Sequence, residues 1–258
     1  MQIQKPIFVF GCSNSGTTIL WQALKRHISL SGPDVEDQDI EGMPDSTRHH
    51  LGKATFRLWA HPRFKLCYYS TEKDYKEEDT QKLQAIYKQF VVTGTRLVVK
   101  SPAHTLRARL IQAYFPDAYF VAIVRNGYAV AEGIVRKRKY DPDRPQFQGL
   151  TTTIEEAAEQ WFRANVVIMS HQKFLRNYLI VRYEDLVQNP EATLHTVLDY
   201  CRLGKADFPV PIPNFEQGKN GEQIARLVKE EAIARRIPKS IAGSVIFSPP
   251  ASATNRSQ

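Results

Sequence analysis

Cysteine is scarce in this chain. Its 258 residues include three, Cys12, Cys67 and Cys201, and no two of them form a Cys-x-x-Cys pair. A zinc ribbon and a disulfide framework both require closely spaced or paired cysteines, so neither is expected. Reduced, buried thiols in a cytoplasmic protein are the simpler interpretation.

Long apolar runs are also absent. No stretch approaches the roughly 18–20 apolar residues of a membrane span, and the run IFVF near the N-terminus is too short for a signal peptide. The formal net charge is +8, but the basic residues are not gathered in one tract. This charge fits an anionic ligand, and nucleic acid is not the partner that it favours.

Short apolar runs and helical segments alternate along the chain. Strands are predicted at 7–10, 97–99, 119–124 and 178–182, and helices at 17–27, 72–91, 105–115, 128–138, 154–175 and 191–201. The strands are continuously apolar, which indicates a parallel sheet covered on both faces. We therefore predict a single three-layer α/β domain over residues 1–246, with about four to five mainly parallel strands, and a disordered tail at 247–258.

The first predicted strand leads directly into the sequence GCSNSGTT at residues 11–18. Its spacing is that of the phosphate-binding loop G-x-x-x-x-G-K-[ST], but Thr17 occupies the lysine position. Backbone N–H groups and the dipole of the following helix favour an anion here. Without the lysine, a phosphate ligand that lacks a γ-phosphate fits better than a magnesium-bound triphosphate. The candidate ligand-binding residues are Gly11, Cys12, Ser13, Asn14, Ser15, Gly16, Thr17 and Thr18.

The sequence GCSNSGTTILWQAL closely resembles the 5′-phosphosulfate-binding loop of sulfotransferases, which use 3′-phosphoadenosine 5′-phosphosulfate (PAPS) as sulfuryl donor. In that family a lysine or arginine usually precedes Ser-Gly-Thr-Thr, whereas this chain has Asn14, which brings no charge. A second stretch, FVAIVRNGYAVAEGI, is similar to the family's 3′-phosphate element. The resemblance makes Arg125 the 3′-phosphate ligand, and it places Gly133 where the family commonly has a serine.

Two further matches extend the resemblance to about residues 6–202. One is KSPAH, and the other is IVRYEDLVQNPEATL, whose Glu184 and Asp185 are expected to brace loops or cap a helix. Beyond residue 205 the likeness weakens, and FEQGKNGEQIARL is either a segment that closes on the nucleotide, with Lys219 near a phosphate, or an exposed turn. The resemblance implies PAPS as co-substrate and requires no metal.

Lys100 ends the predicted strand RLVVK and should share the sheet edge of the phosphate loop. The family often carries a lysine at this strand end, so Lys100 is the candidate for stabilising charge on the leaving group. The general base has three candidates. The resemblance suggests Glu36, with Glu41 as an alternative, and His104 lies four positions after the lysine. Asp37, Asp39 and Glu41 are expected on the acceptor side.

The predicted function is transfer of a sulfuryl group from PAPS to a hydroxyl or amine acceptor by in-line displacement. The acceptor could be a small molecule, a carbohydrate or a lipid. Two alternatives stay open: a nucleotide- or polyanion-binding module with a degenerate loop, and a P-loop kinase-like enzyme. Thr17 argues against the kinase, because it occupies the position of the lysine that reaches the β- and γ-phosphates in such enzymes.

Overall fold

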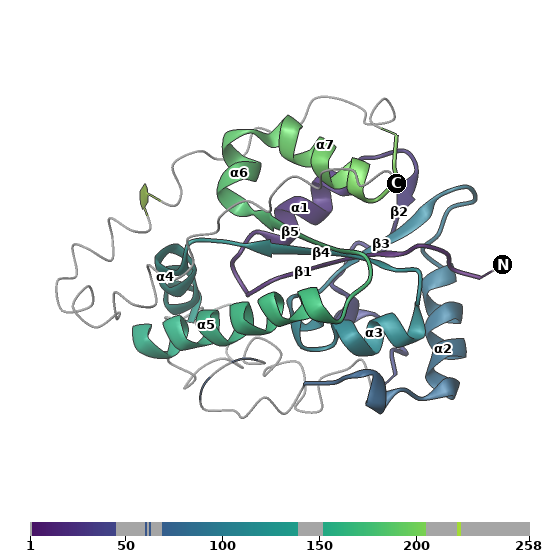
Figure 1. Cartoon of the computed structure of the whole chain (residues 1–258), viewed down its shortest axis with the longest axis horizontal. Helices are drawn as coiled ribbons and strands as arrows, with labels where there is room; N and C mark the ends of the chain where they lie inside the picture. The colour runs from purple at the N-terminus through teal and green to yellow at the C-terminus, as the bar shows by residue number, and fades with distance from the viewer. Residues whose placement is uncertain are drawn as a thin grey trace, which may run out of the picture.

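A parallel sheet forms the centre of the molecule (Figure 1). The computed structural model describes residues 2–44, 60, 62, 69–138, 152–204 and 221–222. Its five strands lie in the order β2-β3-β1-β4-β5, with every pair parallel. The strands are β1 (Ile7–Phe10), β2 (Leu30–Ser31), β3 (Arg96–Lys100), β4 (Tyr119–Val124) and β5 (Tyr178–Arg182).

The predicted fold class is confirmed, because helices cover both faces of this sheet. On one face lie α1, α6 and α7, against which strand residues such as Ile7, Val9 and Val121 are buried. These helices are α1 (Thr17–Leu24), α6 (Tyr183–Gln188) and α7 (Pro190–Tyr200). The short helix α6 was not predicted, since the YEDL stretch was expected only to brace or cap.

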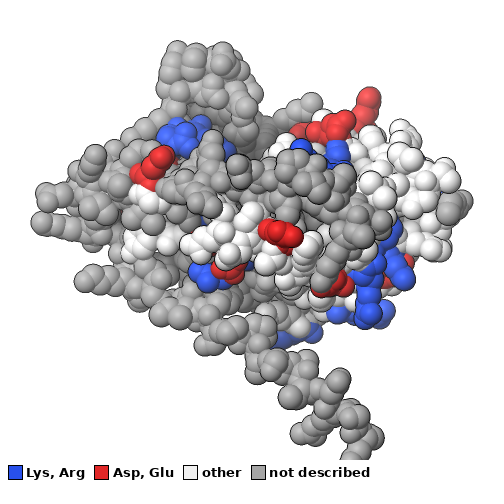
Figure 2. All heavy atoms as spheres, turned by 90° about the horizontal axis from the view of Figure 1, so that it is seen from above, with Lys and Arg blue, Asp and Glu red and all other residues white. Residues whose placement is uncertain are grey.

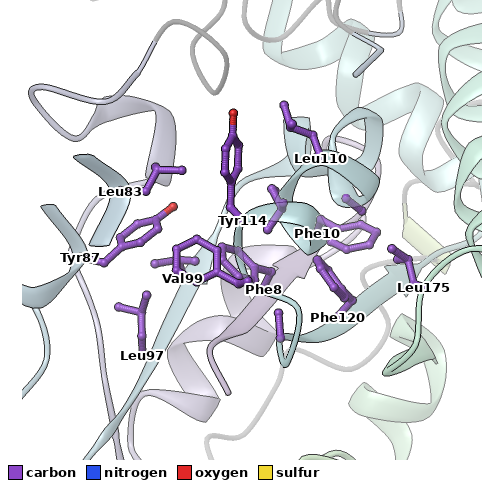
Figure 3. Packing of buried hydrophobic residues seen from close by; sticks show 14 of the residues in the cluster. Phe8, Phe10, Leu83, Tyr87, Leu97, Val99, Leu110, Tyr114, Phe120 and Leu175 are labelled. Atoms are coloured by element: carbon purple, nitrogen blue, oxygen red, sulfur yellow. The ribbon is translucent and has the colours of Figure 1, made fainter. Parts of the chain in front are cut away.

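The other face packs against α2, α3 and α5, and its centre is aromatic. Phe8 stacks on Phe120 with ring centroids 5.7 Å apart (Figure 3), and Phe10 stacks on Tyr178 at 6.1 Å. Because side chains alternate across a strand, Phe8 and Phe10 face this layer while Ile7 and Val9 face the other. The helices are α2 (Glu77–Lys88), α3 (Ala108–Tyr114), α4 (Gly127–Arg138), which packs on α5, and α5 (Ile154–Ser170).

Several predicted helices begin or end differently in the structure. The segment expected to be one helix over 72–91 is a 3₁₀ turn, η3 (Glu72–Asp74), followed by α2. Another 3₁₀ helix, η4 (Pro102–Leu106), precedes α3, and two more are η1 (Asp37–Asp39) and η6 (His171–Lys173). The proposed domain boundary at 246 and the tail at 247–258 lie outside the described residues.

Charges of both signs share the face seen in Figure 2. The described Lys and Arg side chains lie there in several separate groups, with Asp and Glu side chains close by. This face therefore presents no continuous basic tract among its described residues. Among the residues that the structure describes, no helix combines the length and apolarity needed to cross a membrane.

Candidate functional site

Three neighbouring strands bring the predicted site residues to one edge of the sheet. Strand β1 lies between β3 and β4, and it pairs Val9 with Lys100 and Phe10 with Ala122. The 11–18 loop follows β1, Lys100 is the last residue of β3, and Arg125 comes directly after β4. The connection after β1 leads to β2 and β3 on one side of β1, whereas the connection after β3 crosses to β4 on the other side. Ligands of open α/β sheets bind where the strand order reverses in this way.

The loop depends on two glycines that lie close to other elements. A Cβ atom added to Gly11 would lie 2.3 Å from the carbonyl oxygen of Ile123, and one added to Gly16 would lie 2.5 Å from Cδ2 of Tyr183. Gly16 also has φ +98° and is the N-cap of α1, so its backbone is left-handed as well as crowded. Asn14 has φ +68°, a conformation that asparagine tolerates better than most residues.

We expect Gly16→Ala to unfold the protein more easily than Gly94→Ala, a matched control. Both glycines have positive φ, but nothing lies within 4 Å of the Cβ position of Gly94, whose φ is +84°. The control should therefore cost only left-handed strain, about 1–2 kcal/mol, whereas Gly16→Ala adds overpacking and should total about 3 kcal/mol or more. Urea unfolding measures the loss of stability in both variants. Equal losses would show that the contact with Tyr183 adds nothing to the cost of Gly16→Ala.

The hydroxyl groups of the loop differ in their surroundings. The Ser15 Oγ atom is buried and has no hydrogen-bond partner among the described residues. A buried hydroxyl without a partner loses its hydration with no compensation, so a ligand oxygen is a suitable partner for it. Thr17 is buried, and the exposed Thr18 accepts a hydrogen bond from Lys100. These features fit an anionic group bound in the loop.

Arg125 is held beside the loop by several contacts. The residue is 7% exposed, and its guanidinium donates from Nη1 to the carbonyl oxygen of Asn14 at 2.9 Å and lies 4.0 Å from the ring centroid of Tyr183. Burial lowers the pKa of Arg125, while Tyr183 and the carboxylates of Glu184 and Glu132 oppose that shift. An arginine remains charged in proteins, so a fixed cation stands next to the backbone of the loop.

The main chain around Arg125 is also fixed. The indole Nε1 of Trp161 donates to the Arg125 carbonyl oxygen at 2.9 Å, and the Asn126 N–H donates to Glu184 at 2.9 Å. Glu184 thus braces this segment, as predicted for the YEDL stretch. Tyr183 and Trp161 were missed, because only the packing of α5 and α6 brings them to β4.

Lys100 meets the loop and one of the predicted bases at the same time. Its Nζ atom donates to Oγ1 of Thr18 at 2.9 Å and forms an ion pair with the carboxylate of Glu36. The same atom lies 5.7 Å from the ring centroid of Trp21, and the side chain is almost fully buried. An ammonium group is therefore held between the loop and the segment that carries Glu36.

The three candidates for general base occupy different environments. The Glu36 side chain is 28% exposed, and Glu41 lies exposed after η1. His104 is 2% exposed, with its Nε2 atom 2.9 Å from Oδ2 of Asp37. The expectation that Asp37 faces an acceptor is wrong, because this carboxylate is buried and turned toward His104.

The two remaining ligand candidates gain less support. Gly133 is buried within α4, where helix geometry directs its N–H to the carbonyl group four residues earlier. A ligand could therefore use only the space left by its missing side chain. Lys219 lies outside the described residues. The described residues contain no group of three or more His, Cys, Asp or Glu arranged to hold a metal ion.

Comparison with known proteins identifies a family. The profile described as "Sulfotransferase family" matches residues 6–207. The omega-hydroxy-beta-dihydromenaquinone-9 sulfotransferase Stf3 of Mycobacterium bovis is 27% identical over 129 residues, 47% of this chain and 32% of that protein. Nodulation protein NoeE of Sinorhizobium fredii is 23% identical over 251 residues, 89% of this chain and 58% of that protein. The chain thus spans between a third and three fifths of these relatives.

Solved structures share the fold at low sequence identity. The sulfotransferase of Alicyclobacillus acidocaldarius superposes with a TM-score of 0.51 at 14% identity, covering 92% of this chain and 98% of that one. The sulfotransferase domain of the curacin biosynthetic pathway gives 0.50 at 18% identity, covering 96% and 93%. Since the family match spans most of the sequence, the chain belongs to the sulfotransferase family.

Proposed function

We propose that this protein is an enzyme that transfers the sulfuryl group of PAPS to the hydroxyl or amine group of an acceptor. The observation that carries the proposal is the meeting of the 11–18 loop, Lys100 and Arg125 at adjacent strand ends. The donor supplies an activated sulfuryl group. The protein is left to bind the donor, balance the charge of the leaving phosphate, and accept the acceptor's proton.

The loop and Arg125 are the proposed donor site. The main chain of the loop, helped by the N-terminus of α1, is suited to the 5′-phosphate side, and the buried Ser15 hydroxyl adds a donor. Arg125 is assigned to the 3′-phosphate, because a guanidinium can bind a phosphate through two parallel hydrogen bonds. Its contact with the Asn14 carbonyl also keeps a cation beside Asn14, the position at which the family resemblance leads us to expect a lysine or arginine.

Lys100 and Glu36 are the proposed catalytic pair. The ammonium group of Lys100 stabilises negative charge as it develops on the leaving phosphate oxygen. Glu36 accepts the proton of the acceptor hydroxyl while the oxygen of that hydroxyl forms its bond to sulfur. Glu36 is preferred to His104 because its carboxylate is partly exposed beside Lys100, whereas both the imidazole and its partner Asp37 are buried.

A terminal hydroxyl on an apolar chain is the acceptor class to try first. The similar mycobacterial protein is named for an omega-hydroxy menaquinone, and the exposed Val35 next to Glu36 offers an apolar contact. The test combines calorimetry of adenosine 3′,5′-bisphosphate in EDTA with transfer of ³⁵S from labelled PAPS to 1-octanol, a sugar and an alkylamine. Nucleotide binding without transfer to any acceptor would favour a binding module, and no binding would refute the donor site.

Lys100→Met should lower kcat about 100-fold, the typical effect of removing one group that stabilises charge in the transition state. The matched control is Lys25→Met, because Lys25 also lies over the Trp21 ring, at 4.8 Å, and pairs with a carboxylate, that of Asp34. Steady-state rates and bisphosphate affinity should show a loss of kcat for Lys100→Met alone. Equal kcat values for the two variants would show that Lys100 has no catalytic role.

A further inference from the structure

The residue next to the proposed base is a buried carboxylate. Asp37 begins η1, is 1% exposed, and contacts two other elements. The hydroxyl of Tyr87, near the end of α2, donates to its Oδ1 atom at 2.7 Å. The Nε2 atom of His104, in η4, lies 2.9 Å from its Oδ2 atom, within ion-pair distance but without hydrogen-bond geometry between the two. Three segments far apart in the sequence therefore meet at one side chain.

Such a carboxylate holds its segment in one place. Burying a charge is costly unless polar partners compensate it, so a shift of η1 that separated Asp37 from His104 and Tyr87 would be strongly unfavourable. Burial, and to a lesser extent Asp37, raises the pKa of Tyr87 well above its usual range. The hydroxyl therefore remains a donor. His104 is fixed in turn by an edge contact with Phe8, at a centroid distance of 5.6 Å.

The two adjacent carboxylates face two basic residues of one short segment. Glu36 pairs with Lys100, and Asp37 lies against His104, four positions later. The backbone that carries Glu36 and Asp37 is constrained, because the Asp39 N–H donates to the Glu36 carbonyl oxygen at 2.8 Å. The direction of the Glu36 side chain is thus tied to the anchoring of Asp37.

We propose that Asp37, anchored by His104 and Tyr87, is a positioning residue that holds the Glu36 carboxylate against Lys100. His104 acts through Asp37 and never touches the acceptor. This inference rests on the proposed function of Glu36. It gives a role to a buried imidazole and a buried carboxylate that lie next to the Glu36–Lys100 ion pair.

Two substitutions of His104 separate positioning from proton transfer. His104→Leu removes one of the two polar contacts of Asp37 and should lower kcat with 1-octanol about tenfold to 100-fold, the effect of a misplaced catalytic group. His104→Gln places an amide N–H near the Nε2 position, from where it can donate to Asp37, and should restore most of that loss, although an amide cannot act as a base. A glutamine variant as slow as the leucine variant would overturn the proposal in favour of His104 as base.

A double variant tests whether His104 acts through Glu36. In the Glu36→Gln background, His104→Leu should lower kcat by less than threefold, because residues that act as one unit are not additive. Rates are referred to the concentration of sites that bind adenosine 3′,5′-bisphosphate, so partial unfolding does not count. Full additivity would overturn the proposal, since a purely structural histidine would slow both backgrounds equally.

Tyr87→Phe is the alternative test of the Asp37 anchor if the His104→Leu variant does not fold. It removes only the hydroxyl that donates to Asp37 and should lower kcat severalfold with unchanged bisphosphate affinity and no further effect beside Glu36→Gln. An unchanged kcat would count against the anchor. If Glu36→Gln alone keeps the parental rate, the proposed function of Glu36 has failed; if Glu36→Gln is slow but Tyr87→Phe adds to it, only the positioning role has failed.

Discussion

Replacing Arg125 by alanine should weaken binding of adenosine 3′,5′-bisphosphate by at least about 100-fold. A charge-assisted hydrogen bond contributes about 1.5–3 kcal/mol, two of them are available in a bidentate contact, and each 1.4 kcal/mol is a factor of ten in affinity. The guanidinium is already ordered by Asn14 and Tyr183, so little side-chain entropy is lost on binding. Calorimetry without divalent metal measures the change.

Two variants make this measurement specific. Arg125→Lys keeps the charge but loses the planar fork, and it should recover only part of the affinity. Arg136→Ala removes a cation from the far end of α4, where the side chain is 50% exposed and pairs with Glu132, and it should bind the nucleotide as the parent does. Equal affinities for the alanine variants at 125 and 136 would exclude Arg125 from the donor site.

The sheet could be predicted because its strands are short, continuously apolar segments next to recognisable turns. The predictions for β4 and β5 match the structure to the residue, and the loop after β1 could be assigned from its glycine spacing. In the structure Thr153 caps α5 in a capping box with Glu156, a pairing of two residues only three positions apart in the sequence. Each of these signals is local in the sequence.

The environment of the site could not be predicted in the same way. Asp37 lies in a polar, acidic stretch that favours a solvated loop, and it is buried only because η4 and α2 bring His104 and Tyr87 to it. The β2 strand was missed because it has two residues and gains its pairing from β3. Tertiary contacts of this kind leave no periodic pattern, so they override the local preference of the segment.

Glu36→Gln should lower kcat about 100-fold to 10,000-fold, because the amide cannot accept the acceptor's proton and general base catalysis contributes a factor of that order. Bisphosphate affinity should stay within about threefold, since the carboxylate faces Lys100 and not the donor loop itself. Loss of the base appears in kcat, whereas loss of donor binding appears in KM for PAPS, and initial rates at varied PAPS separate the two.

The matched control is Glu41→Gln, which makes the same chemical change five residues later, where the side chain is exposed. Glu41 was also a candidate base, so this variant decides between the two carboxylates. If Glu36 is the base, Glu41→Gln keeps the parental kcat. If Glu41→Gln is slow and Glu36→Gln is not, Glu41 is the base. Glu36 would then only hold the ammonium group of Lys100 where it donates to the Thr18 hydroxyl. Unchanged rates in both variants would require an acceptor that gives up its proton without a carboxylate, such as an acidic phenol, and 4-nitrophenol should then be a better acceptor than 1-octanol.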